Sequence, residues 1–82
     1  MRLQEGMVVC AVAGKEKNSY YLVIGLEERS VLLADGRHRP LEKPKCKNIR
    51  HIRLTSEVWE TEGLTNKELH RRLREYTAKG GI

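Results

Sequence analysis

The apolar residues of this chain gather in short runs before residue 35, and polar residues separate the runs. Three runs, at residues 7–13 (MVVCAVA), 20–28 (YYLVIGLEE) and 30–35 (SVLLAD), are rich in valine, leucine, isoleucine and tyrosine. A fourth run, at residues 48–54 (NIRHIRL), mixes apolar with basic residues and is typical of a half-buried strand. Because β-branched and aromatic residues favour strands, this pattern predicts a mainly β fold.

The first two runs carry further signals. Residues 7–13 are apolar at even and odd positions alike. We expect the even positions to face the core and the odd positions to find partial cover elsewhere. In the second run Leu22, Ile24 and Leu26 share one face, and Gly25 interrupts a strong strand. A glycine at such a point predicts a bulge or a sharp bend, which is how a strand wraps around a small barrel.

A turn follows the third run. Asp35-Gly36 is a hairpin-turn pair, because glycine accepts a positive φ and aspartate tolerates it. Pro40 and Pro44 then lack the N–H that a central strand needs. Residues 37–47 are therefore predicted to form an extended, adaptable loop with a short edge strand near residues 39–41.

The C-terminal part has a different composition. Residues 56–64 are acidic and polar, and we interpret them as a linker whose Trp59 seals the open end of the barrel, or else stacks on a base. Thr65 with Glu68 forms a capping box, and Gly80-Gly81 supplies a stop, so a helix is predicted over residues 65–80. The chain is thus divided into a barrel at 1–55, a linker at 56–64 and a helix at 65–80.

The predicted helix is amphipathic. Its apolar stripe, Leu69, Leu73 and Tyr76, must dock on the barrel or on a partner, because an isolated helix of this length is marginal in water. The opposite side is basic and is either solvated or in contact with RNA.

Positive charge is concentrated in one stretch. Residues 36–53 hold seven lysines and arginines against one acid, a local charge of +6 in a chain whose net charge is +5. The remainder of the chain is therefore close to neutral. Two interpretations stay open: a flexible, solvated basic loop, or a surface that binds the phosphate backbone of a nucleic acid.

Several other classes of protein find little support. Cys10 and Cys46 stand alone without close metal-ligand pairs, so we expect reduced thiols, no zinc site and a cytoplasmic protein. No apolar run approaches the roughly 20 residues that span a bilayer. The acids around residues 27–35 have no paired histidine, and a domain of 82 residues buries too little surface for a large pocket. We expect no catalysis and no cofactor.

Residues 6–28 (GMVVCAVAGKEKNSYYLVIGLEE) resemble a KOW motif, in which Gly14 corresponds to the loop glycine. Residues 32–55 (LLADGRHRPLEKPKCKNIRHIRLT) are similar to a segment of archaeal and eukaryotic large-subunit ribosomal protein fourteen. The resemblance extends to short bacterial KOW-domain RNA-binding proteins and covers residues 6–55.

This resemblance implies a five-stranded SH3-like barrel that binds structured ribosomal RNA as a ribosome-associated or ribosome-assembly protein, without catalysis. It leaves open whether such a protein is a constitutive ribosomal component, a transient factor or a binder of another RNA. We expect a monomer, with RNA and ribosomal proteins as partners.

The candidate RNA-binding residues come from two loops and the last strand. We expect the loop residues to adapt to the RNA, and the arginines of the strand to set its orientation. The set is Lys15, Lys17, Arg37, Arg39, Lys43, Lys45, Lys47, Arg50, His51 and Arg53. Tyr20 or Tyr21 either stacks on a base or covers the barrel.

The alternative is a protein-interaction barrel of the transcription or translation machinery. In that hypothesis the apolar helix stripe docks a partner protein, and the basic stretch recognises an acidic surface.

Overall fold

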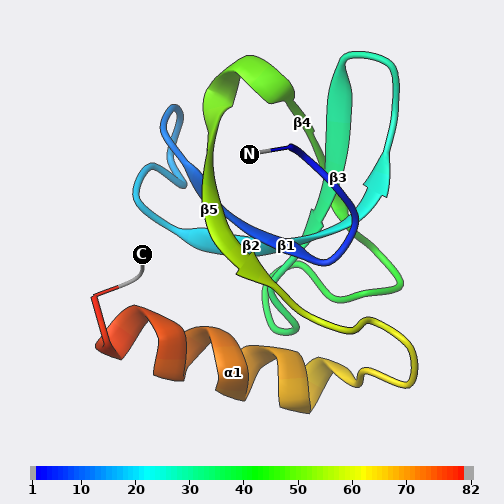
Figure 1. Ribbon diagram of the computed structural model, residues 1–82, viewed down its shortest axis with the longest axis vertical. Helices are drawn as coiled ribbons and strands as arrows, with labels where there is room; N and C mark the ends of the chain where they lie inside the picture. Colours follow the sequence, from blue (N-terminus) through cyan, green and yellow to red (C-terminus); the bar gives the residue numbers. More distant parts are fainter. Residues whose placement is uncertain (1, 81–82) are drawn as a thin grey trace.

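The computed structural model describes residues 2–80. Five antiparallel strands form one sheet in the order β4-β3-β2-β1-β5, and a helix follows. The elements are β1 Met7–Ala11, β2 Tyr20–Leu26, β3 Ser30–Ala34, β4 Lys45–Asn48, the 3-10 turn η1 Ile49–His51, β5 Ile52–Val58 and α1 Asn66–Ala78. Figure 1 shows that the sheet curls and that α1 lies along its outer side. The chain is mainly β, as predicted, and the curled sheet is compatible with a small barrel.

Both faces of the sheet are buried. The inner face carries the cluster Met7, Val9, Ala11, Tyr21, Val23, Val31 and Leu33. The outer face carries Val8, Leu22 and Ala34, which pack against Leu69 and Leu73 of α1. The even positions Val8 and Cys10 are buried as expected, but the odd positions of β1 are fully buried in the interior instead of finding only partial cover. Val12, expected in the core, follows the strand and is 38% exposed.

The gap between the two edge strands is bridged by η1. The Ile49 N–H donates to the Arg29 carbonyl at 3.1 Å, and the Val12 N–H donates to the His51 carbonyl at 2.9 Å. These bonds join η1 to the β2–β3 turn and to the end of β1, and Ile49 packs against the inner cluster. The curl of the sheet is therefore fixed by a single turn of chain.

The predicted strand at residues 48–54 was wrong in its first half. The Asn48 side chain accepts a hydrogen bond from the Arg50 N–H at 2.8 Å and so starts the 3-10 turn, and β5 begins only at Ile52. The edge strand expected near residues 39–41 does not form either. In the described chain this segment consists of a bend and a turn. The edge strand is β4, which begins directly after Pro44.

The bulge predicted at Gly25 is confirmed. The pairing of β2 with β3 shifts register between Val23 and Gly25. A Cβ on Gly25 would lie 2.9 Å from Cδ1 of Leu32. The glycine lets the Leu32 side chain of the neighbouring strand pack closely at the bulge.

The helix begins as predicted. Oγ1 of Thr65 accepts the Glu68 N–H at 3.2 Å, and α1 ends at Ala78, two residues before the predicted end. Gly80 has a positive φ of 100° after the helix, and Gly81 lies outside the described residues. No helix within residues 2–80 is long and apolar enough to cross a membrane.

Trp59 packs under the helix rather than sealing the barrel end. Its ring packs edge-on against the Tyr76 ring, with the ring centroids 6.1 Å apart, and its Nε1 donates to the Glu57 carboxylate at 2.8 Å. β5 runs to Val58, so the predicted linker at 56–64 starts inside a strand. The linker is shorter because Met7 of β1 pairs with Val58.

Candidate nucleic-acid interface

Two of the predicted RNA-binding lysines point toward the inner face of the curled sheet. In the register of β4 with β3, Lys45 lies opposite Leu33 and Lys47 lies opposite Val31, both of which belong to the inner cluster. Directly opposed residues of an antiparallel pair share a face. The two lysine side chains therefore extend inward from β4.

Glu16 of the β1–β2 loop receives both lysines. Its carboxylate lies 3.0 Å from Nζ of Lys45 and 3.3 Å from Nζ of Lys47, and the Lys47 side chain is only 9% exposed. Hydrogen bonds from Lys45 and Lys47 lower the pKa of Glu16 to about 2. An ion-pair cluster thus links β4 to the β1–β2 loop on the inner side of the curled sheet, and we call Glu16, Lys45 and Lys47 the Glu16 clasp.

The Glu16 clasp makes stability depend on pH. A carboxyl with a lowered pKa stabilises the fold fully above its ordinary pKa of 4.5, and this contribution is lost as the pH falls through about 2. We expect Glu16→Gln to be less stable than the unaltered protein near pH 6, and the difference to disappear towards pH 2. Urea unfolding at several pH values measures it.

The control for this experiment is Glu62→Gln. Glu62 is exposed and forms no ion pair with any residue between 2 and 80. E62Q should follow the stability curve of the unaltered protein across the whole pH range. A gap between E16Q and the unaltered protein that stays constant down to pH 2 would contradict the role of the clasp.

The β3–β4 loop, residues 35–44, is fixed rather than adaptable. Oδ1 of Asp35 accepts the N–H groups of Arg37 and Arg39, each at 2.8 Å. The Asn66 side chain then accepts the Leu41 N–H and donates to the Glu42 carboxylate, both at 2.7 Å. The bond from Asn66 also lowers the pKa of Glu42. The expectation of an extended loop that adapts up to Lys47 was therefore wrong, because the helix start holds the loop.

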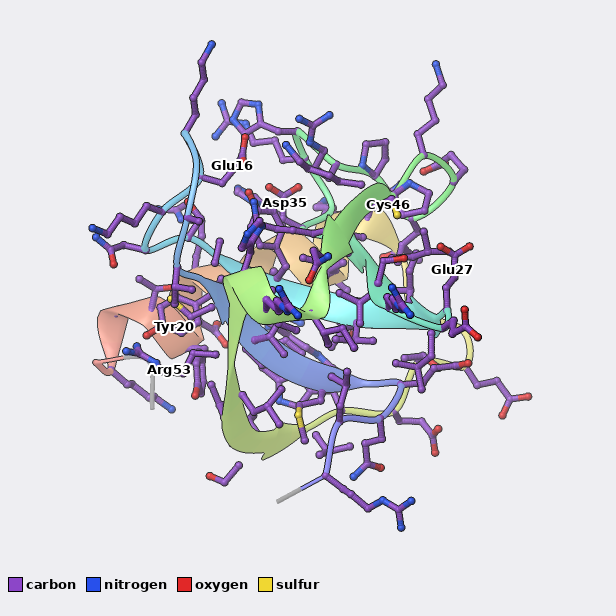
Figure 2. The ribbon with its side chains drawn as sticks, turned by 90° about the horizontal axis from the view of Figure 1, so that it is seen from above. Glu16, Tyr20, Glu27, Asp35, Cys46 and Arg53 are labelled. Atoms are coloured by element: carbon purple, nitrogen blue, oxygen red, sulfur yellow. The ribbon has the colours of Figure 1, made fainter. Side chains whose placement is uncertain are left out.

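Five of the predicted cations, all of them in the two loops, form no ion pair with any described residue. These residues are Lys15, Lys17, Arg37, Arg39 and Lys43, which we call the loop cluster. Both loops leave the same end of the sheet, since each connects antiparallel neighbours there. Figure 2 shows Glu16 and Asp35, which mark the two loops, at the same edge of the molecule.

The two adjacent tyrosines are covered. Tyr21 is 5% exposed within the inner cluster, and burial, followed by the charges of Glu16 and Asp35, raises the pKa of its hydroxyl. The Tyr20 ring packs edge-on against the Tyr76 ring, with the ring centroids 5.5 Å apart. Tyr21 is therefore part of the core, as expected for a ring that covers the sheet, whereas Tyr20 is only partly buried against the outer cluster.

The last three predicted residues do not continue the loop cluster. Arg50 and His51 lie in η1 and are exposed. Arg53 of β5 pairs with Cys10 and is also exposed. In Figure 2 Arg53 lies near Tyr20, across the molecule from Cys46. The basic stretch of residues 36–53 is split because β4 directs its lysines inward and η1 turns the chain away.

A hollow of about 650 Å³ lies beside η1, lined by Arg29, Asn48, Ile49 and Arg50. Arg29 was not among the predicted RNA-binding residues. The residue follows Glu27 and Glu28 in a turn whose local charge is negative. The pairing of Ser30 with Asn48, together with the hydrogen bond between the Ile49 N–H and the Arg29 carbonyl at 3.1 Å, brings Arg29 and Arg50 to the same hollow.

Two arginines of α1 pair with acids of the same helix. Arg71 lies 3.7 Å from both Glu68 and Glu75, and Arg72 lies 3.5 Å from Glu68. Pairs at this spacing stabilise an exposed helix modestly. Lys67 and Arg74 of the same face form no ion pair with the described residues, so the choice between a solvated and an RNA-contacting face stays a prediction.

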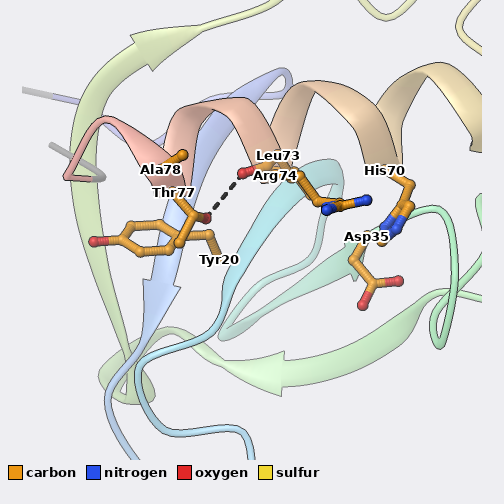
Figure 3. Close-up of a pocket in the computed structure, with 7 residues that line it drawn as sticks. All are labelled: Tyr20, Asp35, His70, Leu73, Arg74, Thr77 and Ala78. Carbon is orange, nitrogen blue, oxygen red and sulfur yellow. Dashed lines mark hydrogen bonds between the residues drawn. The ribbon is translucent and has the colours of Figure 1, made fainter.

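A second hollow, of about 400 Å³, separates α1 from the sheet (Figure 3). Two of its polar groups already have partners: Thr77 donates to the Leu73 carbonyl at 2.8 Å, and Oδ1 of Asp35 holds the β3–β4 loop. His70 lines it, but forms no hydrogen bond with any described group. No cluster of three or more potential metal ligands occurs in residues 2–80, and Cys10 and Cys46 are both free thiols.

The chain was compared with models of known protein families and with curated proteins, and neither comparison found a match.

Proposed function

We propose that this protein binds RNA through the loop cluster, without a catalytic role. The observation that carries the proposal is the charge balance at that end of the sheet. Each acid nearby has a partner: Glu16 binds two lysines, Asp35 caps the loop and Glu42 binds Asn66. The five cations of the loop cluster are therefore left to act on an external anion.

The fold supports this proposal. The five antiparallel strands and the curl of the sheet agree with the barrel that the KOW resemblance implies. Structured ribosomal RNA is the target that the same resemblance favours, in the cytoplasm and as part of ribosome function or assembly. Because the strand tyrosines are covered, base stacking contributes little and recognition rests on phosphates and RNA shape.

The alternative, a protein-interaction barrel, loses its main argument. That hypothesis used the apolar stripe of the helix to dock a partner protein. In the structure Leu69 is fully buried and Leu73 is 5% exposed, both against the sheet. The stripe is therefore occupied within the same chain.

The salt dependence of RNA affinity tests the proposal. If the five cations of the loop cluster contact phosphates, log affinity should fall against log salt with a slope of about −3.5 on single-stranded segments. The triple variant Lys15→Gln, Arg37→Gln, Lys43→Gln should reduce the slope to about −1.4 and weaken binding at least about tenfold. Fluorescence anisotropy with a labelled ribosomal RNA fragment measures both quantities.

A charge-matched variant serves as the control. Lys67→Gln, Arg74→Gln, Lys79→Gln removes three exposed cations from the helix, and none of them forms an ion pair within the described chain. This variant should bind nearly as the unaltered protein does. Equal losses in the two variants, or a slope near zero for the unaltered protein, would rule out the loop cluster as the RNA site.

A further inference from the structure

We propose that the hollow beside η1 is a second phosphate-binding site, in which Arg29, Asn48 and Arg50 hold one nucleotide of the bound RNA. Two of its four lining residues are arginine and none is acidic. This inference deepens the proposed RNA binding and rests on it. It adds Arg29, which no feature of the local sequence selects.

The backbone that carries the donors around the hollow is held by hydrogen bonds before any ligand arrives. Arg29 and Ile49 are joined by a backbone hydrogen bond of 3.1 Å. Oδ1 of Asn48 accepts the Arg50 N–H at 2.8 Å, which orients the side-chain amide. The turn that carries Arg29 is itself closed, because the Glu27 N–H donates to the Ser30 carbonyl at 2.9 Å. Such a fixed frame reduces the ordering cost of binding.

The chemistry of the lining suits a nucleotide phosphate. Neither arginine forms an ion pair with the described residues, and a guanidinium presents a fork of donors that fits phosphate oxygens. Nδ2 of Asn48 donates to no group between residues 2 and 80, so it is available as a further donor. Ile49 supplies an apolar wall for a ribose or base.

The acids of the neighbouring turn do not compete for the site. Glu27 accepts the Ser30 hydroxyl at 3.0 Å and the Cys46 thiol at 3.6 Å, and it lies with Cys46 in Figure 2. Glu28 is exposed and is not part of the lining. Glu27 is thus engaged with Ser30 and Cys46, and the lining of the hollow itself holds two arginines and no acid.

The position of the hollow relative to the loop cluster favours one RNA strand as the ligand. β4, Lys45–Asn48, connects the β3–β4 loop to the hollow and is an edge strand of the sheet. Three residue steps along a strand span about 10 Å, which is too far for one phosphate to reach both sites. A strand of RNA lying along β4 contacts both.

Two experiments on the full 82-residue chain test this site. The first is NMR titration with uridine 5′-monophosphate, with uridine as the matched ligand that lacks a phosphate. We expect the nucleotide to shift the Nε signal of Arg29 and the Nδ2 signals of Asn48, and uridine to leave them unchanged. The second measures RNA affinity for Arg29→Gln, with Arg74→Gln on the helix as the charge-matched control.

Arg29→Gln should weaken RNA binding about tenfold and Arg74→Gln less than twofold, since only the first removes a charge-assisted hydrogen bond to phosphate. The double variant Arg29→Gln, Arg50→Gln should reduce the salt slope by about 0.7, as for one phosphate. Equal effects of R29Q and R74Q, or signals that uridine moves as much as the nucleotide does, would overturn the proposed site.

The outcomes separate this inference from the proposed function. If the loop-cluster triple variant loses RNA affinity and R29Q does not, the hollow is not a site and the proposed function stands. If the unaltered protein binds no RNA but the nucleotide still shifts Arg29 and Asn48, the phosphate site stands and the RNA proposal falls.

Discussion

Leu69→Ala is expected to lower the free energy of unfolding by about 3 kcal/mol, within the range of about 2–5 kcal/mol for large-to-small changes in a core. Leu69 is fully buried between α1 and the sheet, where it packs with Val8 and Leu22. Removing its side chain leaves a cavity that the rigid sheet cannot fill. For a domain of this size the melting temperature should fall by about 15 °C.

Urea unfolding followed by circular dichroism measures this effect. The control is Leu26→Ala, because Leu26 is 48% exposed at the end of β2. L26A should cost less than about 1 kcal/mol. If the two variants proved equally stable, the helix would not be docked on the sheet in solution, and the apolar stripe would be free for a partner after all.

Gly36→Ala is expected to destabilise the protein by about 2–5 kcal/mol, and to displace the β3–β4 loop. Gly36 has a φ of 81°, which costs a residue with a side chain about 1–2 kcal/mol. A Cβ there would also collide with the carbonyl oxygen of Asn66 and lie 2.9 Å from the backbone nitrogen of His70. Overpacking against backbone costs about 1–3 kcal/mol more, because neither partner is a flexible side chain.

Gly63→Ala separates the cost of the positive φ from the cost of the collision with the helix backbone. Gly63 has a similar φ of 74°, but a Cβ there would meet nothing within 4 Å. G63A should therefore show only the backbone strain, about 1 kcal/mol. Equal losses in G36A and G63A would mean that the loop does not rest on the helix start.

The same pair of variants links the fold to the proposed function. Gly36 stands beside Arg37, and Asn66 holds Leu41 and Glu42 of the same loop. A shift of the loop away from α1 would move Arg37, Arg39 and Lys43 relative to Lys15 and Lys17. We expect G36A to weaken RNA binding at temperatures where it remains folded, and G63A to bind as the unaltered protein does.

Local sequence signals determined several elements of this protein. The apolar runs predicted the positions of the first three strands, Gly25 predicted the bulge, and Thr65 with Glu68 predicted the start of the helix. Each of these rests on interactions between residues close in the sequence, or on the intrinsic preference of one residue. The same signals could not choose between the two faces of β1, because both are apolar and the helix that covers one of them lies far away in the chain.

The candidate site shows the same division. The sequence identified where the basic residues are and that they outnumber the acids, and the five cations of the loop cluster were all among those predicted. It could not identify which cations are used internally. Lys45 and Lys47 pair with Glu16, about thirty residues earlier, and Arg29 meets Arg50 through the pairing of β3 with β4 and a backbone bond from Ile49. Charge along the chain is a property of the sequence, whereas the partner of each charge is decided by strand register and by the closure of the sheet, which only the tertiary structure sets.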